Sequence, residues 1–227
     1  MTVSVQAGEV QSMFGRIAGR YDLANNVLSG GIHLAWRRAL VSAVPRSAIV
    51  LDIATGTGGV LEPLRRRCRT AVGVDFCLPM LSVGADRGVP NLICGDGLRL
   101  PFRDGAFDAV TIAFGVRNFQ DPLAGLKEMR RVLVPGGRVN VLEFGQPRAA
   151  WFRAVYDAYS RWILPRLGAL LTGERAAYEY LPETSRHFPC GESFCELLRE
   201  AGFSGPRYRA LTGGIAYLYE AIVPKDR

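Results

Sequence analysis

The strongest indication of the fold is an apolar strand that runs directly into a glycine turn, in Val50-Leu51-Asp52-Ile53-Ala54-Thr55-Gly56-Thr57-Gly58-Gly59. Residues 48–53 are short, apolar and β-branched, as in a buried parallel strand. Gly56 and Gly58 lack a Cβ, so the backbone can pass close to a ligand. A second strand then ends at Asp75, whose carboxylate can accept hydrogen bonds from both hydroxyls of a ribose. This order predicts a nucleoside-cofactor site, and a tight turn without a ligand is the alternative.

Three later segments extend the predicted sheet. Residues 91–96 are apolar and end in Asp96, which is placed to accept the exocyclic amine of an adenine. Residues 107–113 form a fourth predicted strand, and residues 133–139 contain a helix end, a Pro-Gly-Gly turn and the start of a fifth. The turn at residues 56–59 lacks the third glycine of the dinucleotide fingerprint, so a pyrophosphate is not expected.

Composition favours one water-soluble domain. The chain has 227 residues, of which 48% are hydrophobic and 22% charged. No apolar run reaches the roughly 20 residues that span a bilayer, and the first residues lack a signal-peptide pattern, so we expect a cytoplasmic protein. Five cysteines without a C-x-x-C pair and two histidines predict no metal site. The net charge of +7 fits solubility, an anionic membrane face or nucleic acid.

The domain divides into three predicted regions. Residues 1–46 hold helices at 9–21 and 33–44, joined by a segment rich in turn formers, and are expected to form a helical lid. Residues 47–145 form the cofactor-binding sheet. Residues 146–227 begin with an aromatic stripe over 151–163 and end in a strand pattern at 215–223, and we expect them to face the substrate or a membrane.

The succession of strands, glycine turn and acids over residues 45–145 resembles the class I S-adenosylmethionine-dependent methyltransferases. The resemblance implies an α/β fold with a Rossmann-like, mostly parallel sheet, an antiparallel C-terminal strand and helices on both faces. It assigns the acids that bind the cofactor to Asp52, Asp75 and Asp96. The other cofactor-binding residues that it implies are Gly56, Thr57, Gly58, Gly97 and Ala113.

Motifs over almost the whole chain are similar to a narrower family, the quinone-biosynthesis C-methyltransferases. They include Phe14-Gly15-Arg16-Ile17-Ala18-Gly19-Arg20-Tyr21-Asp22, Gly30-Gly31-Ile32-His33, Phe114-Gly115-Val116-Arg117-Asn118 and Leu142-Glu143-Phe144. Members of this family, the demethylmenaquinone and 2-polyprenyl-6-methoxy-1,4-benzoquinol methyltransferases, use S-adenosylmethionine to methylate a ring carbon of a polyprenylated quinol. The chain departs from the family at Gly59, where an acid is usual, at Gly97, where alanine is common, and at Ala113, where serine is usual.

The resemblance also implies an acceptor site beside the fourth strand. We expect Arg117 to stabilise a phenolate, Asn118 to orient it and Tyr21 to close the pocket from the lid. A salt bridge from Arg117 to Asp52 or Asp75 is the alternative for Arg117, and core packing is the alternative for Tyr21. His33 is interpreted as a structural residue at a helix start.

The partner of the aromatic stripe at 151–163 stays open. Neighbouring arginines suit an anionic membrane surface, and the same stripe could dock on its own core or on the second subunit of a homodimer. Nucleic acid is not expected, because residues 113–116 lack the Asn-Pro-Pro-Tyr type sequence of base-amine methyltransferases. Two alternatives to quinol methylation remain, a different small aromatic acceptor and a non-catalytic binding protein.

Overall fold

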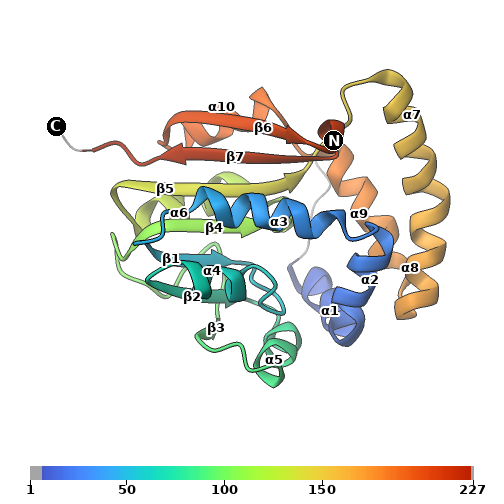
Figure 1. Cartoon of the computed structure of the whole chain (residues 1–227), viewed down its shortest axis with the longest axis horizontal. Helices are drawn as coiled ribbons and strands as arrows, with labels where there is room; N and C mark the ends of the chain where they lie inside the picture. Colours follow the sequence, from blue (N-terminus) through green and yellow to red (C-terminus); the bar gives the residue numbers. More distant parts are fainter. Residues whose placement is uncertain (1–6, 226–227) are drawn as a thin grey trace.

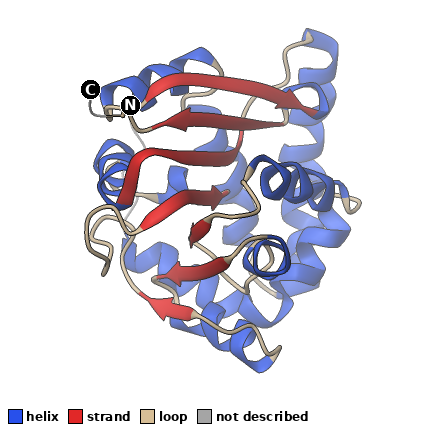
Figure 2. Cartoon of the chain, turned by 60° about the vertical axis from the view of Figure 1, so that its left-hand side comes forward, coloured by secondary structure: helices blue, strands red, loops and turns tan. Residues whose placement is uncertain are grey.

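A seven-stranded sheet in the order β3-β2-β1-β4-β5-β7-β6 forms the centre of the protein, shown as a computed structural model of residues 7–225 (Figures 1 and 2). Strands β1 to β5 pair in parallel, and β7 runs antiparallel to both of its neighbours. The predicted sheet with an antiparallel C-terminal strand is therefore confirmed. The strands are β1 (Ile49–Ile53), β2 (Thr70–Asp75), β3 (Leu92–Cys94), β4 (Phe107–Ala113), β5 (Leu133–Phe144), β6 (Ser204–Leu211) and β7 (Ala216–Ile222).

Helices cover both faces of this sheet, because successive strand residues point to opposite sides and both sides are apolar. On one face α3 (Ile32–Ala43) and α4 (Leu61–Arg67) pack on β1, β4 and β7. On the other face α6 (Pro122–Val132) and α10 (Glu192–Glu200) pack on the same strands. A further helix, α5 (Leu78–Asp86), contacts β2 and β3.

The remaining helices form a cap beyond the carboxyl ends of the parallel strands (Figure 1). The cap joins segments that lie far apart in the sequence, because Met13 and Ala24 share a buried cluster with Leu164 and Tyr178. No helix within residues 7–225 is long and apolar enough to cross a bilayer. The cap elements are α1 (Ala7–Ile17), a 3₁₀ turn (Ala18–Arg20), α2 (Tyr21–Leu28), α7 (Ala150–Ala158), a π-helical turn (Tyr159–Ile163), α8 (Leu164–Thr172) and α9 (Arg175–His187).

Two local predictions are wrong. The segment at 21–32, expected as a loop because of its turn formers, contains α2, whose Ala24 is fully buried in the cap. Tertiary packing here overrides weak helix propensity. The Pro-Gly-Gly sequence is a bulge inside β5, because β4 pairs first with Leu133 and then with Arg138. Of the predicted lid, residues 1–6 lie outside the described residues, and α3 at its end packs on the sheet.

Candidate active site

The Asp75 carboxylate connects the glycine turn to the end of β2 through hydrogen bonds. One oxygen accepts a hydrogen bond from Gly56 N at 2.8 Å, and the other accepts one from Cys77 N at 2.8 Å. Burial raises the pKa of the Asp75 carboxyl, and these backbone donors offset part of that effect. Each oxygen keeps a second acceptor position, so the carboxylate can still receive two hydroxyl groups.

Asp52, at the end of β1, holds its two neighbouring segments by side-chain hydrogen bonds. Thr55 Oγ1 donates to it from the glycine turn at 2.7 Å, and Thr111 Oγ1 donates from β4 at 2.6 Å. The carboxyl is fully buried, and this desolvation raises its pKa from 3.8 to about 6 despite both hydroxyl donors. Asp52 therefore stabilises the local backbone and carries a titration close to neutral pH.

A pocket of about 190 Å³, here called the glycine-turn pocket, lies at the carboxyl ends of β1, β2 and β4. It brings together seven residues that the sequence singled out: Tyr21, Gly56, Asp75, Asp96, Gly97, Ala113 and Asn118. Asp52, Thr57 and Gly58 do not line it. Thr57 Oγ1 donates to Asp22 at 2.8 Å, and Gly58 lies against Val89, where a Cβ would come within 2.9 Å of a methyl carbon. Those two residues connect the turn to its surroundings.

Packing explains two departures from the family pattern. At Gly97 a Cβ would lie 2.6 Å from the ring of Phe119, which occupies the space beside the pocket. At Gly59 a Cβ would lie 2.4 Å from Nη1 of Arg37. The guanidinium therefore fills the position that an acidic side chain would take, and its Nη1 lies 4.0 Å from Asp22 instead.

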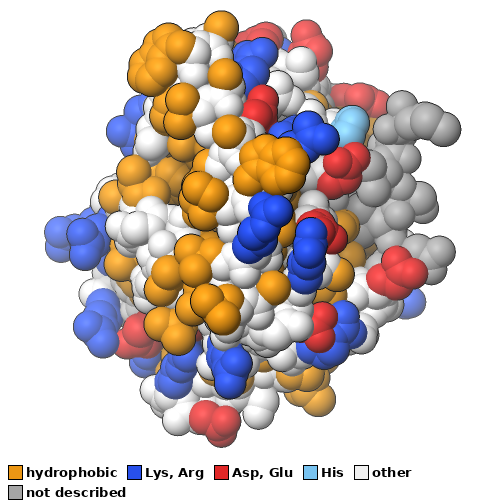
Figure 3. Space-filling model, turned by 90° about the vertical axis from the view of Figure 1, so that its right-hand side faces the viewer, with side chains coloured by type: hydrophobic (Ala, Val, Ile, Leu, Met, Phe, Trp, Pro, Cys, Tyr) orange, Lys and Arg blue, Asp and Glu red, His pale blue; other side chains and the backbone are white. Residues whose placement is uncertain are grey.

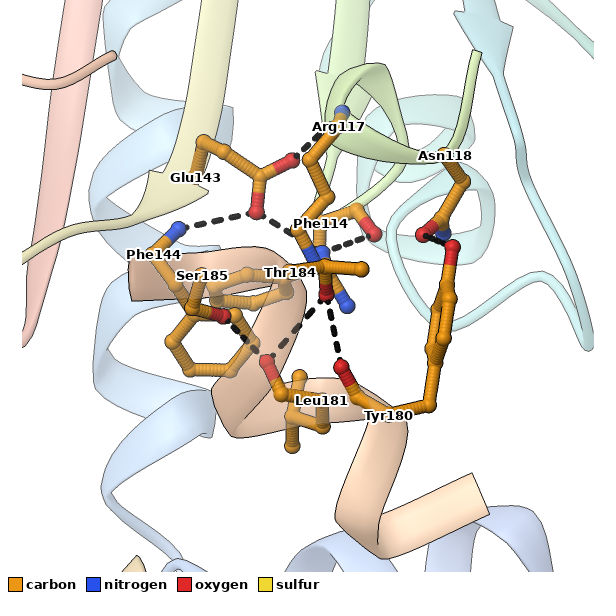
Figure 4. A network of polar contacts seen from close by, with 9 residues as sticks. All are labelled: Phe114, Arg117, Asn118, Glu143, Phe144, Tyr180, Leu181, Thr184 and Ser185. Carbon is orange, nitrogen blue, oxygen red and sulfur yellow. Dashed lines mark hydrogen bonds and ion pairs between the residues drawn. The ribbon is translucent and has the colours of Figure 1, made fainter. Parts of the chain in front are cut away.

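Arg117 forms a buried ion pair with Glu143 at the end of β5 (Figure 4). Its Nη1 donates to Glu143 Oε1 at 2.8 Å and to Phe114 O at 2.5 Å. Both side chains are almost fully buried, with exposed fractions of 4% and 1%. The alternative prediction, a salt bridge from Arg117 to Asp52 or Asp75, is wrong because the partner is Glu143. Asn118 lies beside this pair and accepts a hydrogen bond from Tyr180 Oη at 3.2 Å.

A second, larger cavity of about 450 Å³, here called the apolar pocket, lies between the sheet and the cap. Phe14, Tyr21 and Phe114 line both pockets, so the two spaces meet at these rings. Phe114 packs on Phe144 with ring centroids 4.3 Å apart, and Trp36 completes this aromatic wall. Apolar walls with a few polar groups are typical of sites for small organic molecules.

The model of the ubiE/COQ5 methyltransferase family matches residues 1–222. The chain belongs to this family. It is 48% identical to the demethylmenaquinone methyltransferase of Deinococcus radiodurans over 92% of this chain and 90% of that protein. It is 44% identical to the ubiquinone/menaquinone biosynthesis C-methyltransferase UbiE of Bdellovibrio bacteriovorus, over 94% and 95% of the two chains. The resemblance inferred from the motifs is therefore confirmed.

Solved structures at low identity share the fold. An S-adenosylmethionine-dependent methyltransferase from Thermotoga maritima gives a TM-score of 0.68 at 20% identity, covering 93% of this chain and 98% of its own. The [4+2]-cyclase SpnF gives a TM-score of 0.70 at 16% identity, covering 99% and 98%. Because one of these relatives is a cyclase, the fold alone does not define the reaction.

Sequence reasoning missed Glu143 as a site residue, although it noted the segment that contains it. A carboxylate inside an otherwise apolar strand requires a buried partner, and that signal was available. Trp36 and Tyr180 were also missed. They reach the pockets from α3 and α9, and no local pattern reports such long-range proximity.

Asp52 predicts a pH dependence of stability. Its pKa is about 6 in the fold and 3.8 in the unfolded chain, so the folded protein keeps its proton at pH values where the unfolded chain has lost it. The resulting stabilisation is complete below about pH 4 and is lost as the pH rises through about 6, with a total of about 3 kcal/mol. The free energy of unfolding of the parent and of Asp52→Asn, measured with denaturant below about pH 4 and above about pH 6, gives this stabilisation. The advantage of the parent over the variant should shrink as pH rises, and a constant difference would contradict the assignment.

Proposed function

We propose that this protein uses S-adenosylmethionine to methylate a ring carbon of a prenylated quinol, with demethylmenaquinol as the acceptor and menaquinol as the product. The ubiquinone-pathway benzoquinol is the second acceptor of the same class. This proposal rests on the junction of the two pockets, which share Phe14, Tyr21 and Phe114 in their walls. A nucleoside cofactor on one side and an apolar ring on the other can meet there. The names of the relatives support the same acceptor class.

The residues of the glycine-turn pocket fit S-adenosylmethionine. Asp75 offers two carboxylate oxygens to the ribose, and Asp96 offers an acceptor to the adenine amine. Close backbone packing preserves the space, because a Cβ on Gly115 would lie 2.6 Å from Ala54. When bound, the cofactor supplies a sulfonium-activated methyl group. The protein then has to align the acceptor carbon and stabilise charge on its oxygen.

Arg117, Asn118 and Tyr21 are the residues that we assign to the acceptor. Arg117 lines the apolar pocket, Asn118 lines the glycine-turn pocket, and Tyr21 lines both. Because Glu143 neutralises Arg117, the guanidinium acts through directed hydrogen bonds more than through net charge. Nη1 is fixed by Glu143 and Phe114, which pre-organises the remaining N–H groups for the oxygen of the quinol.

The structure divides the aromatic stripe at 151–163 into two sets. Phe152, Tyr156 and Tyr159 line the apolar pocket. Trp151 and Trp162 are exposed to 72% and 55%, and within α7 no described residue is buried. The second set therefore does not dock on the protein's own core.

Nine large apolar side chains of α2, α3, α7, the π-helical turn and α8 are exposed, and they are here called the apolar patch. It consists of Leu23, Val27, Ile32, Leu34, Trp151, Val155, Trp162, Ile163 and Leu170. Figure 3 shows this side of the molecule, with apolar side chains beside arginines. Ile32 and Val155 belong to both the patch and the pocket wall, which connects the two. Arg161 and Arg166 stack on Trp162. We infer that the patch rests on an anionic membrane, from which the polyprenyl tail enters the pocket.

Replacing Asp75 with alanine should weaken binding of S-adenosylmethionine at least tenfold, since two charge-assisted hydrogen bonds are worth roughly 1.5–3 kcal/mol each. Asp96→Ala should have a smaller effect, because the adenine amine is neutral. Asp108→Ala is the control, since Asp108 also accepts a backbone hydrogen bond, from Ile49, outside the pocket. Calorimetric titration measures all three. Unchanged binding by Asp75→Ala would refute the ribose assignment.

Arg117→Ala should lower the single-turnover rate of demethylmenaquinol methylation about a hundredfold or more, with cofactor affinity near that of the parent. Arg117→Lys should recover only part of the rate, because an ammonium lacks the planar fork. The single change leaves Glu143 buried without a partner, which costs about 3–5 kcal/mol. The neutral pair Arg117→Gln with Glu143→Gln is therefore the folded control. Parent-like turnover in that double variant would remove Arg117 from the chemistry.

The membrane assignment predicts that exposed tryptophans drive vesicle binding. Trp151→Ser combined with Trp162→Ser should weaken sedimentation with phosphatidylglycerol vesicles at least tenfold, because each ring buries apolar area worth about 2 kcal/mol. Leu78→Ser is the control, since Leu78 is 61% exposed on α5, outside the patch. Equal losses in both variants would contradict the assignment. A dimer of the parent that the tryptophan changes dissociate would identify the patch as a subunit interface.

Deletion of the gene, followed by mass measurement of the accumulated quinones, tests the proposed function directly. We expect a demethylated naphthoquinone to accumulate, and a demethylated benzoquinone would identify the second acceptor. An unchanged quinone profile would refute the proposal.

A further inference from the structure

His33 lies at the start of α3 in the wall of the apolar pocket and is 6% exposed. Its Nδ1 lies 2.7 Å from Ser29 Oγ. From the sequence, His33 was interpreted as a structural residue at a helix start. Its hydrogen bonds, however, determine which ring nitrogen carries the proton.

Ser29 has one hydroxyl hydrogen, and the structure fixes where that hydrogen points. Ser29 Oγ lies 2.6 Å from the carbonyl oxygen of Asn25, one helical turn earlier. A carbonyl oxygen can only accept, so the hydroxyl must donate to it. Ser29 Oγ is then the acceptor of the contact with His33, and Nδ1 must be the donor. The neutral ring is therefore protonated on Nδ1 and carries its lone pair on Nε2.

Nε2 makes no hydrogen bond to any of residues 7–225, so its lone pair is not occupied within the fold. Burial and the neighbouring Arg37 lower the pKa of His33 to about 4, although Asp22 acts in the opposite direction. The ring is therefore neutral at physiological pH. Arg37 lies on the same helix, and Asp22 lies in the first turn of α2.

The other polar residues of the apolar pocket are poor proton acceptors. Among the described residues no carboxylate lines this pocket. Arg37 and Arg117 are cations. Tyr159 donates its hydroxyl hydrogen to Leu28 O, and burial raises the pKa of its phenol. The phenol of Tyr180 is likewise engaged, through its donation to Asn118.

We propose that Nε2 of His33 takes the proton of the quinol hydroxyl next to the methylated carbon, as the general base of the reaction. This inference rests on the proposed function and adds a residue to it. It also replaces our interpretation of His33 as a purely structural residue. Arg117 and His33 then have separate tasks, because one stabilises the oxygen and the other receives its proton.

The protons and electron pairs of this step balance. The new carbon–methyl bond forms as the sulfur–methyl bond breaks, and the electron pair of the broken bond stays on sulfur. The neighbouring C–OH becomes a protonated carbonyl, a far stronger acid than an imidazolium, so its proton moves to Nε2. When the hydrogen on the methylated carbon leaves to water, its bonding pair restores the aromatic ring and the oxygen recovers the proton from His33. One proton is released overall, and no oxidant or reductant is needed.

The pKa of about 4 keeps the imidazole of His33 neutral before the reaction begins. A neutral imidazole is available at the outset, and a weakly held proton is returned readily.

The tautomer can be tested without catalysis. The chain has two histidines, His33 and His187, so nitrogen-15 labelling gives two ring spin systems, and His187→Gln identifies each. We expect the proton of His33 on Nδ1, and addition of a short-chain menaquinol should shift the Nε2 resonance. A proton on Nε2 would overturn the proposal.

The chemistry is tested with His33→Asn, whose amide nitrogen can still donate to Ser29 Oγ while the base is removed. Single-turnover methylation of short-chain demethylmenaquinol should fall at least a hundredfold, while affinities for the quinol and for S-adenosylmethionine stay within about threefold. Free imidazole should restore part of the rate to His33→Ala. Parent-like turnover in His33→Asn would overturn the proposal while leaving the proposed function intact. A parent that binds S-adenosylmethionine and does not methylate the quinol would refute both.

Discussion

The buried ion pair between Arg117 and Glu143 fixes the region in which the two pockets meet. It joins the turn after β4 to the end of β5, and through Phe114 O it holds a residue with a positive φ of 58°. A side chain rarely adopts that backbone conformation unless the surroundings enforce it. The ring of Phe114 is thereby placed between the glycine-turn pocket and the apolar pocket. Loss of either charge would leave its partner buried and would release this arrangement.

The central fold was predictable because its signals are local. Strands β1 to β4 are short apolar runs, each ended by a turn or an acid, and β4 at Phe107–Ala113 has the predicted bounds. The cap was less predictable. Helix α2 contains Asn25 and Asn26, which favour turns, and it is helical because Ala24 packs against α8 and α9. That contact joins residues more than a hundred positions apart, and no window of sequence contains it.

The candidate site was predictable where one strand end supplies one function. Gly56, Asp75 and Asp96 lie together in the pocket, as the order of strand, turn and acid indicated. Glu143 was not assigned and His33 was interpreted as structural, because their roles depend on partners in three dimensions. A buried carboxylate is defined by its guanidinium, and an imidazole tautomer is defined by the hydroxyl beside it. The sequence identifies such residues but does not show which side chains they contact.

The proposed reaction places the methyl group on a carbon of the quinol ring. The most direct measurement supplies the protein with S-adenosylmethionine carrying a carbon-13 methyl group and with short-chain demethylmenaquinol, and locates the label in the product by nuclear magnetic resonance. We expect a label bonded to the ring carbon next to a hydroxyl. A label on oxygen, or an unlabelled quinol in the presence of bound cofactor, would contradict it.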